Sequence, residues 1–225
     1  MTAPSKLRFV LGNLALIVGL PAAALFVQAF VASWYDVPSK SMDPTFKVGD
    51  KIWVNKLARD LDDYERGDMV IFATNPVIND ECKLPLHPNN GFEQIWWQTR
   101  SAFGLDPITT EDYTTTFTKR LVGLPGDTLS VKASQVYING NPLAEEYVAA
   151  VPEKYQDRMY DLPETTVPDN SVVVLGDNRI WSCDSSMWGF LPATQLRGKV
   201  TAKVWPLSDA QFFASPDYTQ TTAEQ

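Results

Sequence analysis

The first long pattern in the chain is a segment without any charged residue, over residues 9–32. At about 1.5 Å per helical residue it reaches roughly 30 Å or slightly more, which is enough to cross a bilayer. Lys6 and Arg8 precede it, and this positive charge predicts that residues 1–8 stay in the cytoplasm. The pattern therefore predicts one transmembrane anchor over residues 9–32.

A cleavable signal peptide is the alternative for the same region, because small residues follow the apolar stretch at Pro21–Ala24. Apolar residues continue well beyond that point, which favours an uncleaved anchor. Trp34 and Tyr35 then lie where an aromatic belt at the membrane surface is expected. Under either interpretation the rest of the chain lies outside the cytoplasm.

Beyond residue 36 the hydrophobic pattern becomes that of short strands, each bounded by Gly, Pro, Asp or Asn. The expected strands are residues 51–55, 69–72, 116–122, 135–138, 171–175 and 198–205. The pair Asn139-Gly140 suits the tight type I′ turn of a hairpin. The pattern predicts an all-β, mostly antiparallel domain.

This exported β domain is expected to cover residues 36–206. Residues 74–113, rich in Pro and Asn, and residues 143–169, which mix acids, tyrosines and prolines, have the composition of insertions into the β core. Residues 207–225 are expected to form a polar tail.

Composition narrows the functional class of this 225-residue chain. Its formal net charge is -8 and its basic residues are scattered, so a nucleic-acid partner is not expected. The single histidine, His87, lies in a loop-like stretch, which disfavours a Ser-His-Asp triad. One histidine with two distant cysteines, Cys82 and Cys183, is a poor zinc ligand set. The two cysteines can form a disulfide or remain free thiols, and the sequence leaves both possibilities open.

With these routes disfavoured, a serine activated by a lysine becomes the candidate chemistry. Ser41 lies just after the apolar segment, and Lys119 lies in an expected strand followed by apolar Leu121 and Val122. A serine hydroxyl needs a base, and burial lowers the pKa of a lysine ammonium so that it can accept a proton. The ordinary alternative for Lys119 is a solvated strand lysine.

Several motifs occur in a fixed order behind the apolar segment. They are Pro38–Thr45 (PSKSMDPT), Gly49–Lys56 (GDKIWVNK), Arg66–Phe72 (RGDMVIF), Lys119–Asp127 (KRLVGLPGD), Gly176–Arg179 (GDNR) and Ser182–Pro192 (SCDSSMWGFLP). In this order and position, the chain closely resembles bacterial type I signal peptidases, the leader peptidases. The resemblance covers the apolar segment and nearly all of the β core.

The resemblance implies a role for five residues. Ser41 matches the nucleophile and Lys119 its general base. Ser39 matches the residue whose hydroxyl lines the oxyanion hole with the backbone N–H of Ser41. Ser182 matches a serine that orients the lysine amine, and Asp184 an aspartate that organises the site. Arg120, next to Lys119 on a strand, is expected to point to the opposite face in a structural role.

Three positions depart from the family pattern. Lys40 stands between the two serines where a small residue is common, and Cys183 replaces a commonly small residue. Ser186 stands where many members carry arginine, so an ion pair with Asp184 is not expected. Either another group satisfies Asp184, or the site is looser.

By the same resemblance we expect a membrane-bound serine endopeptidase of the bacterial inner membrane, with its catalytic domain on the outer side. It would remove N-terminal signal peptides from exported preproteins by cutting after small residues, as a monomer at the lipid bilayer and without a metal or cofactor. A relative dedicated to one substrate, such as a conjugative pilin, is the main alternative. An inactive membrane-tethered binding protein and a self-cleaving cytoplasmic regulator fit the sequence less well.

Overall fold

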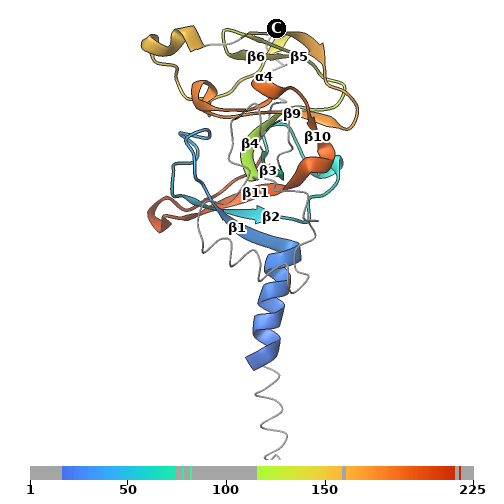
Figure 1. Ribbon diagram of the computed structural model, residues 1–225, viewed down its shortest axis with the longest axis vertical. Coiled ribbons are helices and arrows are strands. Elements are labelled where there is room, and N and C mark those ends of the chain that lie inside the picture. The colour runs from blue at the N-terminus through green and yellow to red at the C-terminus, as the bar shows by residue number, and fades with distance from the viewer. Residues whose placement is uncertain are drawn as a thin grey trace, which may run out of the picture.

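The computed structural model describes residues 17–73, 78, 82, 116–158, 161–215 and 218. The predicted cytoplasmic residues 1–8, the first part of the predicted anchor and His87 lie outside the described residues, as does most of the predicted insertion 74–113. The described chain consists of a helix that projects from a β domain (Figure 1).

The β domain contains two sheets. The larger sheet has the strand order β1-β2-β11-β3-β4-β9-β10, with β12 paired to β11. Its strands are β1 (Ala32–Asp36), β2 (Lys51–Asn55), β3 (Met69–Ala73), β4 (Thr116–Gly123), β9 (Ser171–Leu175), β10 (Leu191–Pro192), β11 (Leu196–Trp205) and β12 (Gln211–Phe212). The smaller sheet has the order β7-β6-β5-β8. Its strands are β5 (Thr128–Lys132), β6 (Gln135–Ile138), β7 (Asn141–Pro142) and β8 (Leu162–Thr166).

Short helical segments precede the first strand and lie between later ones. They are η1 (Val27–Val31), η2 (Leu61–Asp63), η3 (Glu153–Arg158), η4 (Arg179–Trp181), α4 (Ser185–Trp188), η5 (Ala193–Gln195) and η6 (Leu207–Asp209). Every strand pairing in the described part of the chain is antiparallel. The predicted mostly antiparallel β fold is therefore confirmed, and each of the six expected strands is present.

The period-two pattern of side chains sorts the core residues onto two faces of the larger sheet. On β3, Val70 and Phe72 pack into one hydrophobic cluster, while Met69 and Ile71 pack into another on the opposite face. A third cluster joins the sheets, because Val173 of β9 packs with residues of β5 and β6. The central strands are thus buried on both faces, which excludes water from side chains that they carry.

The smaller sheet contains the predicted hairpin. Asn139 and Gly140 both have positive φ, at 51° and 83°, as a type I′ turn requires, and they join β6 to β7. Strand β8 lies within residues 143–169, the segment interpreted as an insertion, and pairs with β5. This segment therefore completes the smaller sheet.

Residues 17–26 are helical and continue into η1, after which the chain enters β1. Among the described residues, no helix is both long and apolar enough to span a bilayer. Trp34 and Tyr35, expected at the membrane surface, belong to β1 and pair with Trp53 and Ile52 of β2.

The first part of the expected polar tail is ordered against the larger sheet. After η6, strand β12 pairs with β11, and the Phe213 ring packs edge-on against Phe46 with 5.4 Å between centroids. The Ser215 hydroxyl donates a hydrogen bond to Asp68. Polar composition therefore did not prevent residues 207–215 from packing on the domain.

Candidate active site

Ser41 begins a turn that follows β1 and packs against the loop after β9. The backbone N–H of Asn178 donates to the Ser41 carbonyl over 3.1 Å, and the Asn178 side chain donates to the Lys40 carbonyl over 3.1 Å. The next side chain, Met42, is fully enclosed in the hydrophobic cluster around β2 and β3. These contacts fix the backbone on both sides of Ser41, whose own exposure is 6%.

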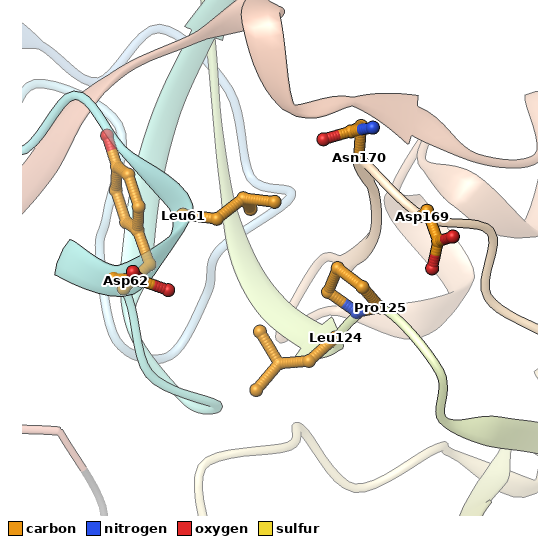
Figure 2. A pocket seen from close by; sticks show the side chains of 7 residues that line it. Leu61, Asp62, Leu124, Pro125, Asp169 and Asn170 are labelled. Atoms are coloured by element: carbon orange, nitrogen blue, oxygen red, sulfur yellow. The ribbon is translucent and has the colours of Figure 1, made fainter.

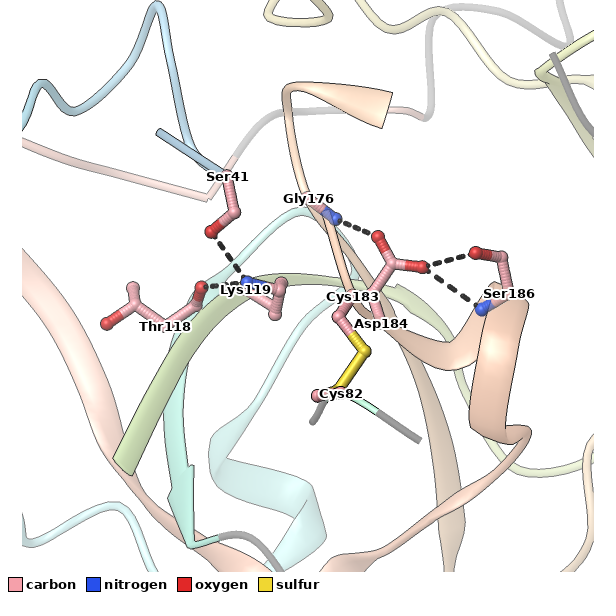
Figure 3. Close-up of a disulfide and its surroundings, with 8 residues drawn as sticks. All are labelled: Ser41, Cys82, Thr118, Lys119, Gly176, Cys183, Asp184 and Ser186. Carbon is pink, nitrogen blue, oxygen red and sulfur yellow. Dashed lines mark hydrogen bonds between the residues drawn. A yellow bond between two sulfur atoms is a disulfide. The ribbon is translucent and has the colours of Figure 1, made fainter. Parts of the chain in front are cut away.

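Lys119 lies in the middle of β4, opposite Val70 of β3, and is 3% exposed. Its Nζ lies 2.6 Å from Ser41 Oγ and donates to the Thr118 carbonyl over 3.2 Å (Figure 3). The structure therefore brings together the two residues predicted to perform the chemistry, which are separated by 78 positions.

Burial lowers the pKa of the Lys119 ammonium to about 8, because the charged form loses its hydration. The negative charges of Asp184 and Asp177 oppose this shift and keep it from being larger. Lys119 is thus not the solvated strand lysine of the ordinary alternative. Near neutral pH an appreciable fraction of these amines is uncharged and can accept a proton.

Ser39 lies beside the pair. Its Oγ is 3.2 Å from Ser41 Oγ, and either hydroxyl can donate. Its hydroxyl therefore faces the same space as the Ser41 hydroxyl, where a substrate carbonyl would be attacked.

Asp184 is completely buried and caps the short helix α4. One carboxylate oxygen accepts hydrogen bonds from the Ser186 N–H over 3.0 Å and the Ser186 hydroxyl over 2.7 Å. The other accepts from the Gly176 N–H over 2.8 Å (Figure 3). The sequence left open whether other groups replace an arginine partner of Asp184 or whether the site is looser. Hydrogen bonds from Ser186 and Gly176 satisfy the carboxylate, so the first alternative is correct.

Ser182 lies near Ser41, but its hydroxyl makes no hydrogen bond to Lys119. Its Oγ is buried without a hydrogen-bond partner. A Cβ added at Gly176 would meet Ser182 Oγ at 2.3 Å and the Ser41 carbonyl at 2.5 Å. The Ser182 side chain and the Ser41 carbonyl therefore both pack against the α-carbon of Gly176, where any side chain would collide with them. The orientation of the amine by Ser182 stays a prediction.

A buried ion pair behind the site has no local signal in the sequence. Arg120 donates through Nε and Nη2 to the two carboxylate oxygens of Asp177, over 2.8 and 2.7 Å. Thr45, at the end of the nucleophile turn, donates to the same carboxylate over 2.5 Å. Arg120 points away from Lys119, as expected from adjacent strand positions. Asp177 therefore links the strand of Lys119 to the turn of Ser41.

A disulfide joins Cys82 to Cys183, with the Cα atoms 5.8 Å apart. Cys183 stands between Ser182 and Asp184, so the bridge ties the loop of the site to the chain beyond β3 (Figure 3). The sequence could not decide between a bridge and free thiols, because the decision depends on a distance between residues far apart in the chain.

A separate cavity of about 610 Å³ opens elsewhere on the domain (Figure 2). Its lining residues are Leu61, Asp62, Tyr64, Leu124, Pro125, Asp169 and Asn170. They include none of the five predicted site residues. Within the described ranges, no group of three or more His, Cys, Asp or Glu side chains is placed to hold a metal ion.

A buried lysine amine with a lowered pKa lies against a serine hydroxyl on an antiparallel β scaffold, which is the arrangement that serine hydrolysis with a lysine base requires. The model of the family described as signal peptidase, peptidase S26, matches residues 10–205. The chain therefore belongs to the peptidase S26 signal peptidases, as the resemblance implied.

Relatives named signal peptidase I match most of the chain. A probable signal peptidase I-2 from Synechocystis sp. is 34% identical over 184 residues, which cover 82% of this chain and 68% of that protein. The signal peptidase I of Bacillus caldolyticus is 31% identical over 194 residues, with 83% and 86% covered. A solved signal peptidase I from Enterococcus faecalis V583 is 25% identical, with a TM-score of 0.40, over 61% of this chain and 97% of that one. The family assignment depends on the sequence matches alone.

Proposed function

We propose that this protein is a serine endopeptidase that removes N-terminal signal peptides from exported preproteins, with Ser41 as nucleophile and Lys119 as general base. The observation that carries the proposal is the 2.6 Å contact between Lys119 Nζ and Ser41 Oγ in a buried setting. The names of the bacterial relatives favour general signal-peptide removal over a single dedicated substrate.

In the proposed reaction, the neutral Lys119 amine takes the proton of the Ser41 hydroxyl as Oγ attacks the scissile carbonyl. The Ser39 hydroxyl and the Ser41 backbone N–H stabilise the negative charge that develops on the carbonyl oxygen. Lys119 then gives the proton to the leaving amine, and an acyl-enzyme ester remains. Water, deprotonated by the same amine, hydrolyses the ester and frees Ser41.

The other two predicted residues take supporting roles in this proposal. Asp184 holds the loop after β9 in place through its three accepted hydrogen bonds. Ser182 would turn its unpartnered hydroxyl toward the amine once a substrate is bound. The substrate would enter extended and add a strand beside the β core, with small side chains at the first and third positions before the cut.

The proposed site of action is the outer face of the bacterial inner membrane. An anchor over residues 9–32, with residues 1–8 in the cytoplasm, would hold the domain there. Trp34 on β1 and Phe212 on β12 are 57% and 91% exposed. Strand β1 follows directly on the projecting helix (Figure 1). Exposed aromatic side chains suit a membrane interface. The disulfide favours an oxidising compartment, as expected outside the cytoplasm.

The proposal is tested by cleavage of a purified preprotein by the full-length chain in detergent. Ser41→Ala and Lys119→Met should each reduce cleavage at least a thousandfold while the circular dichroism spectrum is unchanged. Lys132→Met serves as the matched control, because Lys132 is an exposed strand lysine on the smaller sheet. Substantial cleavage by either active-site variant would overturn the assigned roles.

A further inference from the structure

Lys40, one of the departures from the family pattern, stands between Ser39 and Ser41 in the chain. The hydroxyls of these two serines converge to 3.2 Å, so both side chains lie on one side of the backbone. The side chain between them is exposed to solvent. Its backbone is fixed, because the Lys40 carbonyl accepts hydrogen bonds from the Asn178 side chain and the Asp43 N–H, each over 3.1 Å. Lys40 therefore presents its stem outward from a rigid base beside the nucleophile.

The Lys40 ammonium makes no hydrogen bond or ion pair with any residue that the structure describes. Asp43, in the same turn, is not paired with it. The neighbouring cations are neutralised, since Arg120 is bound to Asp177 and Arg179 to Glu145. The Lys119 amine must be uncharged to act. Lys40 therefore contributes a positive charge beside the site that no direct ion pair with a described residue neutralises.

The reach of this charge is set by simple geometry. The scissile carbonyl must come to about 3 Å from Ser41 Oγ for attack. The Cα atom of Lys40 is about 3.8 Å from that of Ser41, as for any neighbouring residues. An extended substrate advances about 3.3 Å per residue. The ammonium at the end of a flexible four-carbon stem therefore reaches side chains within about two residues of the scissile bond.

We infer that Lys40 is a specificity residue that favours preproteins with an acidic side chain within two residues of the cleavage point. The inference depends on the proposed function. An exposed ion pair of this kind changes kcat/KM by about two- to fivefold. It is also screened at high ionic strength, because the Debye length falls to about 3 Å at 1 M salt.

The test uses one preprotein in three forms that differ only in the residue after the cut, which is Asp, Asn or Lys. The full-length enzyme in detergent should show kcat/KM two- to fivefold higher for the Asp form than for the Asn form at low salt. The Lys form should be the slowest. In 1 M salt the three values should converge.

The enzyme variants assign the effect to one side chain. Lys40→Gln should give equal values for the Asp and Asn forms, and Lys40→Glu should reverse the order to favour Lys. Lys47→Gln, at another exposed lysine of the same segment, should keep the wild-type ratio.

Two results would overturn the inference: equal values for the Asp and Asn forms with the wild-type enzyme, or a preference that survives in Lys40→Gln. Failure of the wild-type enzyme to cleave even the Asn form would instead count against the proposed peptidase activity. The two failures are therefore distinguishable in one experiment.

Discussion

Ser186 binds the buried carboxylate of Asp184 twice, through its backbone N–H at 3.0 Å and its hydroxyl at 2.7 Å. The side-chain hydrogen bond takes the place of the ion pair that the family resemblance associates with this position. The Ser186 hydroxyl and the backbone N–H of the helical turn that Asp184 caps thus satisfy hydrogen-bond acceptors of a carboxylate that has no ion-pair partner among the described residues.

This relationship predicts unequal effects of two substitutions. Asp184→Asn replaces a carboxylate that accepts three hydrogen bonds, and should lower the free energy of unfolding by about 1–3 kcal/mol. Ser186→Ala removes one bond and keeps the backbone bond, so it should cost about 1 kcal/mol. Urea denaturation of both variants measures the difference. A larger loss for Ser186→Ala than for Asp184→Asn would contradict the importance given to the carboxylate.

The lowered pKa of Lys119 predicts the pH dependence of cleavage. Below about pH 8 the amine is mostly protonated and cannot take the Ser41 proton, and above that value it is mostly neutral. The value of kcat/KM should therefore rise with pH and reach half of its plateau near pH 8. Initial rates with a neutral peptide between pH 6 and 10 provide the measurement. A profile that is flat or falls over this range would exclude Lys119 as the base.

The close approach at Gly176 predicts a sharp effect of one methyl group. In Gly176→Ala the new Cβ would collide with the Ser41 carbonyl and the Ser182 side chain, so the nucleophile turn must move. Such overpacking costs about 1–3 kcal/mol, and cleavage should fall at least tenfold because Ser41 shifts relative to Lys119. Gly19→Ala is the matched control, since nothing lies within 4 Å of a Cβ at that position. Near-normal activity in Gly176→Ala would contradict this prediction, because it would show that the backbone near Ser41 accommodates the methyl group without displacing Ser41 from Lys119.

The bridge between Cys82 and Cys183 predicts a loss of stability on reduction. The two residues are 101 positions apart, and opening a bridge over such a long segment typically costs about 2–5 kcal/mol. The protein should melt at lower temperature in the presence of dithiothreitol. These are the only two cysteines, so the Cys82→Ser/Cys183→Ser variant should be insensitive to the reductant. An unchanged melting temperature in the reduced wild type would contradict a stabilising role.

Much of the larger sheet could be predicted from the sequence because its strands are short β-rich runs between turn residues. Among the strands that were not expected, β1 and β8 were missed for identifiable reasons. Strand β8 contains Pro163, which is tolerated because β8 is at the edge of the smaller sheet. Strand β1 follows directly on the apolar segment, and its residues were interpreted as part of the membrane boundary. In both cases the segment forms a strand because it pairs with another strand, β2 for β1 and β5 for β8, and the local sequence does not reveal that partner.

The catalytic pair could be proposed from motifs, but its surroundings could not. The hydrogen bond from Thr45 to Asp177 joins residues that are 132 positions apart in the chain. Arg120 and Asp177, which form an ion pair, are 57 positions apart. Local patterns carry no information on such distances. The same holds for the disulfide, whose formation depends on where the chain beyond β3 meets the loop after β9.

The separation of Ser41 from Lys119 by 78 positions along the chain has a consequence for the unfolded protein. In a newly synthesised, unfolded polypeptide both groups are hydrated, so the hydroxyl is unreactive and the amine carries its charge at an ordinary pKa near 10.5. In that state the Ser41 hydroxyl and the Lys119 amine cannot cleave peptide bonds of other proteins. In the proposed mechanism the hydroxyl becomes reactive only when the sheet assembles around the amine and withdraws it from water, so a copy of the protein that has not folded would be inactive.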